Sequence, residues 1–88
     1  MFRGMNGWWV YILRCGDGTL YTGIAVDLPK RVEAHQRGVA AKYTRGRRPV
    51  VLAYHEAQPD RSSALKREAA LRRLGRAGKL ALLAPRRG

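Results

Sequence analysis

The chain has 88 residues, enough for one small domain with a modest core, and its single cysteine, Cys15, excludes an internal disulfide and a multi-cysteine metal site. Eighteen lysines and arginines against six acidic residues give a net charge of +12. This charge favours a polyanionic partner, with nucleic acid first and an anionic membrane surface second. The alternative explanation is an arginine-rich proteome. Because no secretory signal and no apolar run of roughly 20 residues is visible, we expect a soluble, cytoplasmic protein.

Two strands joined by a tight turn are predicted near the N-terminus. The segments Trp8–Arg14 and Leu20–Ile24 are aromatic and β-branched, and Gly16-Asp17-Gly18 separates them. A three-residue turn with its last glycine in the left-handed region would pair position 13 with 21 and position 11 with 23. Side chains alternate along a strand, so Tyr11 and Tyr21 would then project from one face. A two- or four-residue turn would place them on opposite faces. We predict the three-residue turn.

The rest of the chain predicts helices around a third strand. In chain order the expected elements are a helix capped by Asp27, reaching about Gln36 and closed by Gly38; a basic loop, Val39–Pro49; a strand, Val50–Glu56; a helix capped by Asp60 or Ser62 and reaching about Leu74; and a short helix, Arg76–Ala84. The order ββαβαα predicts an α+β fold with a mainly antiparallel three-stranded sheet flanked by helices. This single domain would span residues 8–84, with residues 1–7 and 85–88 as flexible termini.

Several polar residues are candidates for chemistry. Arg31 and His35 are spaced i, i+4 and so share one helix face. Arginine is a fixed-charge fork suited to phosphate, and histidine exchanges protons near neutral pH. The alternative is a solvated helix face. Each tyrosine, taken alone, is equally consistent with a half-buried core residue whose hydroxyl reaches a partner.

Glu68 is the most informative isolated residue. On its predicted helix it is bracketed by Ala64, Leu65 and Leu71, which places it in the middle of an apolar stripe. A carboxylate there is costly unless a cation pairs with it. That cation is either a structural arginine or a metal ion, since one carboxylate with water and phosphate oxygens is a common way to hold Mg²⁺.

A cationic loop is the last candidate. It interleaves Tyr43 with Lys42, Arg45, Arg47 and Arg48. This pattern is typical of surfaces that contact a nucleic-acid backbone and stack on bases.

As a spaced set, these residues resemble the GIY-YIG endonuclease superfamily, and most closely its small stand-alone bacterial branch. The segments that carry the resemblance are WWVYILRC, LYTGI, AKYTRGRRPV and REAALRRL, together with Arg31 and His35, and they cover residues 8 to about 83. The first tripeptide here reads Val-Tyr-Ile and the second Tyr-Thr-Gly.

The resemblance implies a metal-dependent phosphodiesterase acting on DNA. Tyr21 would be the general base or would orient the nucleophile, and Tyr11 would help position water and phosphate. Arg31 would neutralise charge on the scissile phosphate, and His35 would assist proton transfer. Glu68 would hold one divalent ion, Mg²⁺ or Mn²⁺, which polarises the phosphate.

Two physical points accompany this assignment. A phenol with an ordinary pKa of about 10 is a poor base at neutral pH, so the tyrosines need the charge of Arg31 and of the ion to lower that value. Gly23 offers a point without a side chain where the backbone could approach the nucleic acid.

Two classes of function stay open. The first is a nuclease that cuts or nicks DNA in repair or processing. The second is a binding module that uses the same fold to hold DNA or RNA without cutting it. The second is considered because the larger members often carry a polar residue, commonly asparagine, after the glutamate helix, and none follows Glu68 here. A third interpretation is an interaction protein that docks on another repair factor or on the ribosome. A protein partner could also target the chain to its substrate.

Overall fold

The structure is a computed structural model and describes residues 7–84. Its elements are β1 (Trp8–Arg14), β2 (Leu20–Ala25), α1 (Leu28–Gln36), α2 (Lys42–Arg45), β3 (Val51–Gln58), α3 (Arg61–Arg73) and α4 (Gly75–Leu83). The predicted α+β fold is confirmed. The difference is α2, a single helical turn within the segment that was predicted to be an irregular loop. Except for Gly7, the predicted flexible termini lie outside the described residues. No helix within residues 7–84 is long and apolar enough to cross a bilayer.

Helices α1 and α3 each begin at an aspartate cap. Asp27 Oδ1 accepts a hydrogen bond from the Lys30 amide at 3.1 Å, and Asp60 Oδ1 accepts one from the Ser63 amide at 2.8 Å. These bonds satisfy amides that have no partner within the helix. Asp60 is therefore the cap of α3, not Ser62, and α1 is closed by Gly38 at φ 80° as predicted.

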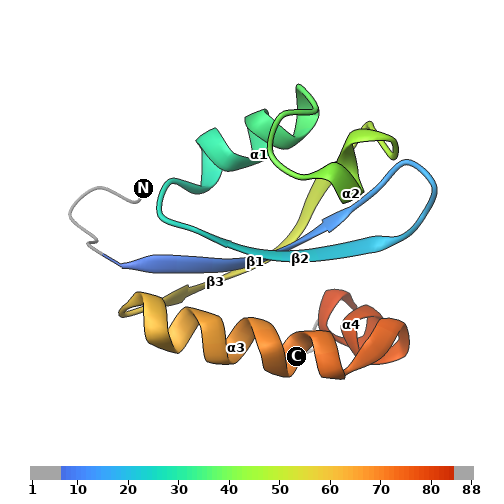
Figure 1. The fold of residues 1–88 in the computed structure, drawn as a ribbon. Coiled ribbons are helices and arrows are strands. Elements are labelled where there is room, and N and C mark those ends of the chain that lie inside the picture. The colour runs from blue at the N-terminus through green and yellow to red at the C-terminus, as the bar shows by residue number, and fades with distance from the viewer. Residues whose placement is uncertain (1–6, 85–88) are drawn as a thin grey trace.

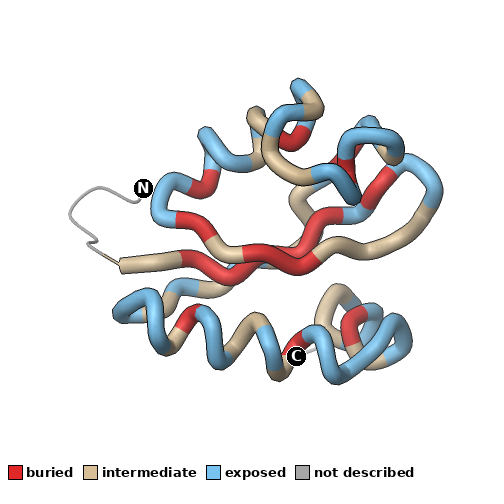
Figure 2. The backbone as a smooth tube through the Cα atoms, in the orientation of Figure 1, coloured by how far each residue is buried: buried red, intermediate tan, exposed pale blue. Residues whose placement is uncertain are grey.

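The three strands form an antiparallel sheet in the order β2-β1-β3, with helices on both faces. Helices α1 and α2 cover one face, and α3 and α4 cover the other (Figure 1). The central strand β1 is almost completely buried (Figure 2), and its side chains enter two separate clusters. Trp9, Tyr11 and Leu13 pack toward α1, whereas Val10 and Ile12 pack toward α3. Strand β2 is left at an edge of the sheet.

The β1–β2 hairpin has the predicted register. Leu13 lies opposite Tyr21, and Tyr11 lies opposite Gly23. The Cys15 amide donates to the Thr19 carbonyl at 2.8 Å, which leaves a three-residue turn with Gly18 at φ 87°. The odd loop length places both phenols on the α1 face, as expected.

Replacing Gly18 with alanine should destabilise the protein by about 1 kcal/mol, because an L-residue is strained in the left-handed region. No atom lies within 4 Å of the added Cβ, so the cost comes from the backbone alone. Urea unfolding should show a lower midpoint with an unchanged m-value. Gly18→Asn should lose less, because asparagine tolerates this conformation. A midpoint in Gly18→Ala equal to that of wild type would contradict the turn geometry.

Candidate active site

Three buried polar side chains connect β1, α1 and α2 through hydrogen bonds. Tyr11 Oη lies 2.8 Å from His35 Nε2, and His35 Nδ1 lies 2.8 Å from Thr44 Oγ1. The Thr44 hydroxyl donates to the Ala41 carbonyl at 3.2 Å, so its oxygen is free to accept from Nδ1–H. The imidazole then carries its proton on Nδ1, and Nε2 accepts the hydrogen of the Tyr11 phenol. All three side chains are fully shielded from solvent.

Burial also keeps Tyr11 and His35 uncharged. Loss of solvent, and next the charge of Arg31, lower the pKa of His35 from 6.5 to about 4, so the imidazole is neutral at pH 7. Burial raises the pKa of Tyr11, although the nearby Arg31 guanidinium opposes the rise. Arg31 thus acts on the Tyr11 pKa in the expected direction, but desolvation is the larger effect and the net shift is upward. Tyr11 and His35 are fully buried and therefore cannot contact a substrate directly in this structure.

The neutral state of His35 predicts a pH-dependent stability. Above pH 6.5 the imidazole is neutral in both folded and unfolded chains. Below pH 6.5 the unfolded chain binds a proton that the folded chain takes up only near pH 4, so the free energy of unfolding falls across this window. The loss should total about 3 kcal/mol at pH 4. Carboxylates also titrate near pH 4, so urea unfolding between pH 7 and pH 5 isolates the effect.

His35→Gln is the control for this prediction, because glutamine has no proton to gain in the window. Its stability should be lower at pH 7 but nearly flat down to pH 5. An equal slope in wild type and His35→Gln would show that another group causes the dependence.

Gly23 lets the Tyr11 phenol lie across the edge strand. A Cβ at this position would be 2.5 Å from Tyr11 Oη and 2.6 Å from Tyr11 Cζ. Both distances are below any tolerable contact, so the glycine is required by packing of the phenol. A direct approach of nucleic acid to the Gly23 backbone stays a prediction.

Tyr21 is the accessible phenol of the pair. It is half-buried, and its ring meets the His35 ring edge-on with centroids 5.2 Å apart. On its other side it stacks on Tyr43 of α2, with centroids 5.6 Å apart and planes at 28°. The Arg47 guanidinium carbon lies 4.0 Å from the centroid of the Tyr43 ring. Tyr21 therefore joins the buried pair to the cationic loop.

The two remaining candidate residues, Arg31 and Glu68, lie on helices that cover opposite faces of the sheet (Figure 1). Arg31 is exposed on α1, one turn before His35, and Glu68 lies on α3. The charges of both residues act on Tyr11, with opposite effects on its pKa. Arg31, Glu68 and Tyr21 therefore all lie close enough to Tyr11 to affect its pKa, and His35 is hydrogen-bonded to it. That these five residues form one active site stays a prediction.

Glu68 makes an ion pair within its own helix. Arg72 Nη2 donates to Glu68 Oε2 at 3.2 Å and also approaches the Thr22 carbonyl at 3.4 Å. The arginine partner that the sequence left open as an alternative is thus present. Because the Arg72 side chain is 57% exposed, this pair contributes little to stability. The apolar stripe is also narrower than expected, since Leu65 is 37% exposed whereas Ala64 and Leu71 are buried.

The surroundings of Glu68 are compatible with one divalent ion. Its second oxygen, Oε1, has no hydrogen-bond partner among residues 7–84. The same residues contain no group of three or more histidine, cysteine or acidic side chains that could hold a metal. A single carboxylate suits Mg²⁺ when waters and substrate phosphate oxygens supply the other ligands. Glu68 therefore fits an ion that is completed by its substrate, not a preformed metal centre.

In the predicted cationic loop, two arginines bond to other parts of the protein and two cations make no such bond. Arg47 pairs with Asp17 at 3.1 Å and donates to the Tyr43 carbonyl at 2.8 Å. Arg48 donates to the Arg45 carbonyl at 2.8 Å and to the Gln36 carbonyl at 3.3 Å. Within the described part of the chain, the exposed side chains of Lys42 and Arg45 make no such bond. These two are the groups best placed to meet a polyanion.

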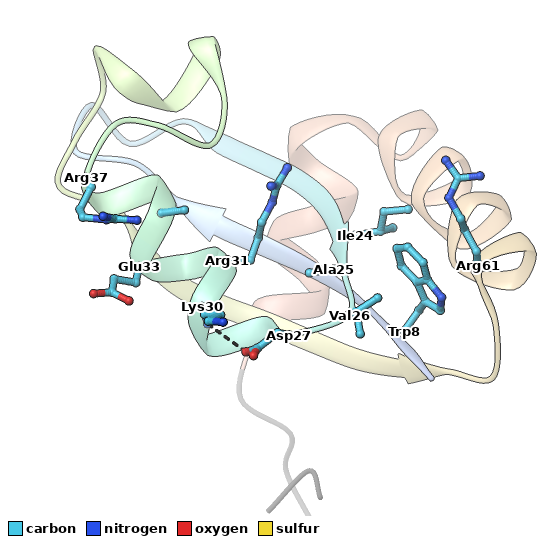
Figure 3. Close-up of a pocket in the computed structure, with 11 residues that line it drawn as sticks. Trp8, Ile24, Ala25, Val26, Asp27, Lys30, Arg31, Glu33, Arg37 and Arg61 are labelled. Atoms are coloured by element: carbon cyan, nitrogen blue, oxygen red, sulfur yellow. Dashed lines mark hydrogen bonds between the residues drawn. The ribbon is translucent and has the colours of Figure 1, made fainter. Parts of the chain in front are cut away.

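An open pocket of about 650 Å³ lies where β2 meets α1. Figure 3 shows Lys30 and Arg31 on α1 and Arg37 just after it, with Trp8 and Arg61 across the pocket. The Arg61 guanidinium carbon is 5.9 Å from the centroid of the Trp8 ring. Sequence reasoning found only Arg31 here. Lys30 and Arg37 could have been found as cations close to Arg31 in the sequence. The contact of Arg61, at the start of α3, with Trp8 could not, because no local sequence pattern predicts it.

The chain matches known sequences over nearly its whole length. A profile of the GIY-YIG catalytic domain matches residues 7–81. UPF0213 proteins from Staphylococcus aureus strains Mu3 and Mu50 are each 50% identical over 82 residues, which covers 93% of this chain and all of the relative.

A solved structure is also similar. The solution NMR structure of a UPF0213 protein from Bacillus halodurans aligns with a TM-score of 0.57 at 40% identity. The alignment covers 88% of this chain and 82% of the other. Since the coverage is nearly complete on both sides, these relatives are similar to the whole described domain.

Proposed function

The chain belongs to the GIY-YIG family of nuclease domains, and on that premise we propose that it is a metal-dependent endonuclease that cuts or nicks DNA. The observation that carries the proposal is the convergence of Tyr21, Arg31 and Glu68 at the β2 edge, above the buried pair Tyr11 and His35. We place its activity in DNA repair or processing in the cytoplasm.

The accessible residues would act on the substrate. Tyr21 would orient or deprotonate the attacking water, because it is half-buried whereas Tyr11 is fully buried. Arg31 would neutralise the charge that develops on the scissile phosphate. Glu68 would hold Mg²⁺ or Mn²⁺, and the ion when bound would polarise the phosphate and stabilise the leaving oxygen.

The buried residues would act through the accessible ones. Tyr11 donates its hydrogen to His35, so its phenol is oriented by a partner that is itself fixed by Thr44. The His35 ring also contacts Tyr21 edge-on. In this arrangement Tyr11 and His35 are positioning residues, and they keep the Tyr21 phenol in place without touching substrate.

Cationic groups at both ends of the β2 edge support a nucleic-acid substrate. Lys42 and Arg45 lie beside the Tyr21 end of the strand through α2, and Lys30, Arg37 and Arg61 line the pocket at its other end. A polyanion that follows the edge would meet positive charge along its length.

Cleavage of single-stranded and duplex DNA with Mg²⁺ or Mn²⁺ tests the proposal. Tyr21→Phe and Glu68→Gln should each lose most of the activity, since each removes one reacting group and conserves shape. Glu33→Gln neutralises an exposed glutamate on α1 that forms no ion pair among the described residues and does not affect the pKa of Tyr11, so it should retain the activity. Equal cleavage by all four proteins would identify a contaminant and overturn the proposal.

A binding module without cleavage is the second candidate, favoured by the Glu68–Arg72 ion pair. An arginine on the glutamate supplies the positive charge that an ion would otherwise bring. Binding to DNA or RNA that weakens steeply with salt, with no turnover in any divalent metal, would select this function over the first.

A further inference from the structure

Lys79 on α4 is a buried cation for which the described residues supply no counter-ion. It is 9% exposed, so its aliphatic stem is largely enclosed, while its Nζ keeps some contact with solvent. All six acidic residues of the chain lie within residues 7–84. The three carboxylates in ion pairs are bound to Arg47, Arg67 and Arg72. Lys79 makes no ion pair or hydrogen bond to any described residue.

The electrostatic surroundings of Lys79 are unfavourable for its charge. Burial lowers its pKa, and the positive charge of Arg72 lowers it further. A buried ammonium ordinarily pairs with an anion, because an unpaired buried charge is costly. Arg72 is paired with Glu68, but Lys79 has no carboxylate among its partners in residues 7–84. The unpaired charge of Lys79 therefore indicates an anion that comes from outside the chain.

Lys79 and Arg72 line one pocket together with residues of the proposed active site. This pocket of about 320 Å³ is also formed by Tyr21, Thr22 and Tyr43. A smaller one of about 220 Å³ adjoins it, because both share Leu20, Tyr43 and Lys79, and Arg76 contributes another cation there. The hollow thus runs along the β2 edge away from the pocket that contains Arg31.

Thr22 provides a second, independent observation. It is 2% exposed, and its hydroxyl oxygen is buried without a hydrogen-bond partner among the described residues. An unpaired buried hydroxyl is unusual, since such groups nearly always find a partner. A phosphate would supply an acceptor for the hydroxyl and a counter-ion for Lys79, and Arg72 lines the same pocket.

We propose that Lys79, Arg72 and Thr22 form a binding subsite for a second phosphate of the substrate, next to the phosphate that reacts at Arg31 and Glu68. The ligand is an internal phosphodiester of the nucleic-acid backbone. The subsite rests on the proposed function. It gives the path of the bound nucleic acid along the β2 edge, from α4 past Tyr21 toward α1.

Metal-free binding of a short labelled oligonucleotide tests the subsite without involving cleavage. Lys79→Met conserves the aliphatic stem and removes the charge. It should weaken binding roughly 10-fold at low salt and reduce the slope of log Kd against log salt by about 0.7–0.9, the value for one lost phosphate contact. Lys66→Met removes the same charge from the exposed surface of α3 and should leave both quantities nearly unchanged. Lys79→Arg should restore most of the affinity.

A titration of the wild-type protein with inorganic phosphate gives a readout that depends on no variant. The NMR signals of the Lys79 side chain and of the Thr22 amide should shift together and saturate. Wild-type affinity and slope in a folded Lys79→Met, or no phosphate-induced shift at these two residues, would overturn the subsite.

The same data separate this inference from the proposed function. An oligonucleotide that binds and is cleaved normally by Lys79→Met contradicts the subsite and leaves the nuclease proposal intact. Phosphate shifts at Lys79 and Thr22 in a protein that neither binds nor cuts any oligonucleotide would support an anion site and contradict the proposed function.

Discussion

Replacing Arg31 with alanine should reduce the rate of DNA cleavage by about 10²–10³-fold with little loss of stability. The magnitude is that expected for removal of one preorganised group that stabilises transition-state charge, about 3–4 kcal/mol. The side chain is exposed on α1, so its truncation removes little buried surface. Single-turnover cleavage with excess enzyme measures the effect directly.

Two further variants make the Arg31 test specific. Arg31→Lys conserves charge but loses the planar fork, and it should recover only part of the rate. Arg73→Ala removes an exposed arginine from α3 and should cut like wild type. Equal losses in Arg31→Ala and Arg73→Ala would mean that total charge, not the position of Arg31, determines activity.

The placement of Arg31 can also be checked without any substrate. Its charge is the second cause, after burial, of the low pKa of His35. Arg31→Ala should therefore raise the pKa of His35 above about 4, although continued burial keeps it below 6.5. An NMR titration of the His35 ring reports this shift. An unchanged His35 titration would place Arg31 too far from the buried pair to act on it.

The fold was predictable because its signals are local. Strand composition, the glycine-flanked turn and the caps at Asp27 and Asp60 each depend on a few neighbouring residues. Even the shared face of Tyr11 and Tyr21 followed from the length of one turn, since register changes the face of every side chain. The short helix α2 was missed because four residues are too few to show a helical period.

Candidate site residues could be named from the sequence, but how deeply each of them is buried could not. Spacing placed Arg31 and His35 on one helix face, yet in the structure the first is exposed and the second is fully buried. His35 is buried because α1 packs against Tyr11 and α2 packs against α1. No local sequence pattern predicts either of these two packing contacts. For the same reason the sequence identified Glu68 but not its partner Arg72, and it gave no reason to single out Lys79.

These differences in burial explain why the phenols differ in role despite equivalent positions in the hairpin. Tyr11 lies on the central strand, where both neighbouring strands and α1 enclose it. Tyr21 lies on the edge strand, where only one side is covered. The buried Tyr11 phenol keeps its proton and donates a hydrogen bond to His35, whereas Tyr21 on the edge strand would be the phenol that meets substrate in the proposed function. Their separation is therefore a consequence of strand order.

Gly23 of the edge strand lies directly against the buried Tyr11 phenol. Gly23→Ala should therefore be among the most damaging single-methyl changes in the chain. The new Cβ would overlap Tyr11 Oη at 2.5 Å, Cζ at 2.6 Å and Cε2 at 3.1 Å. The Tyr11 ring cannot move freely, because β1 is the central strand and His35 holds its hydroxyl. We expect a loss of about 1–3 kcal/mol from overpacking and a fall in Tm of about 4–8 °C for each kcal/mol.

Gly46→Ala is the matched control for Gly23→Ala, because no atom lies within 4 Å of the Cβ that it adds and its φ of −88° suits any residue. Its Tm should stay within about 2 °C of wild type, as for most surface substitutions. Displacement of Tyr11 should also disturb its hydrogen bond to His35, so Gly23→Ala should lose cleavage activity even at temperatures where it is folded. A Gly23→Ala protein with the Tm and activity of Gly46→Ala would show that the phenol does not lie across the edge strand, and the proposed arrangement of the site would then be wrong.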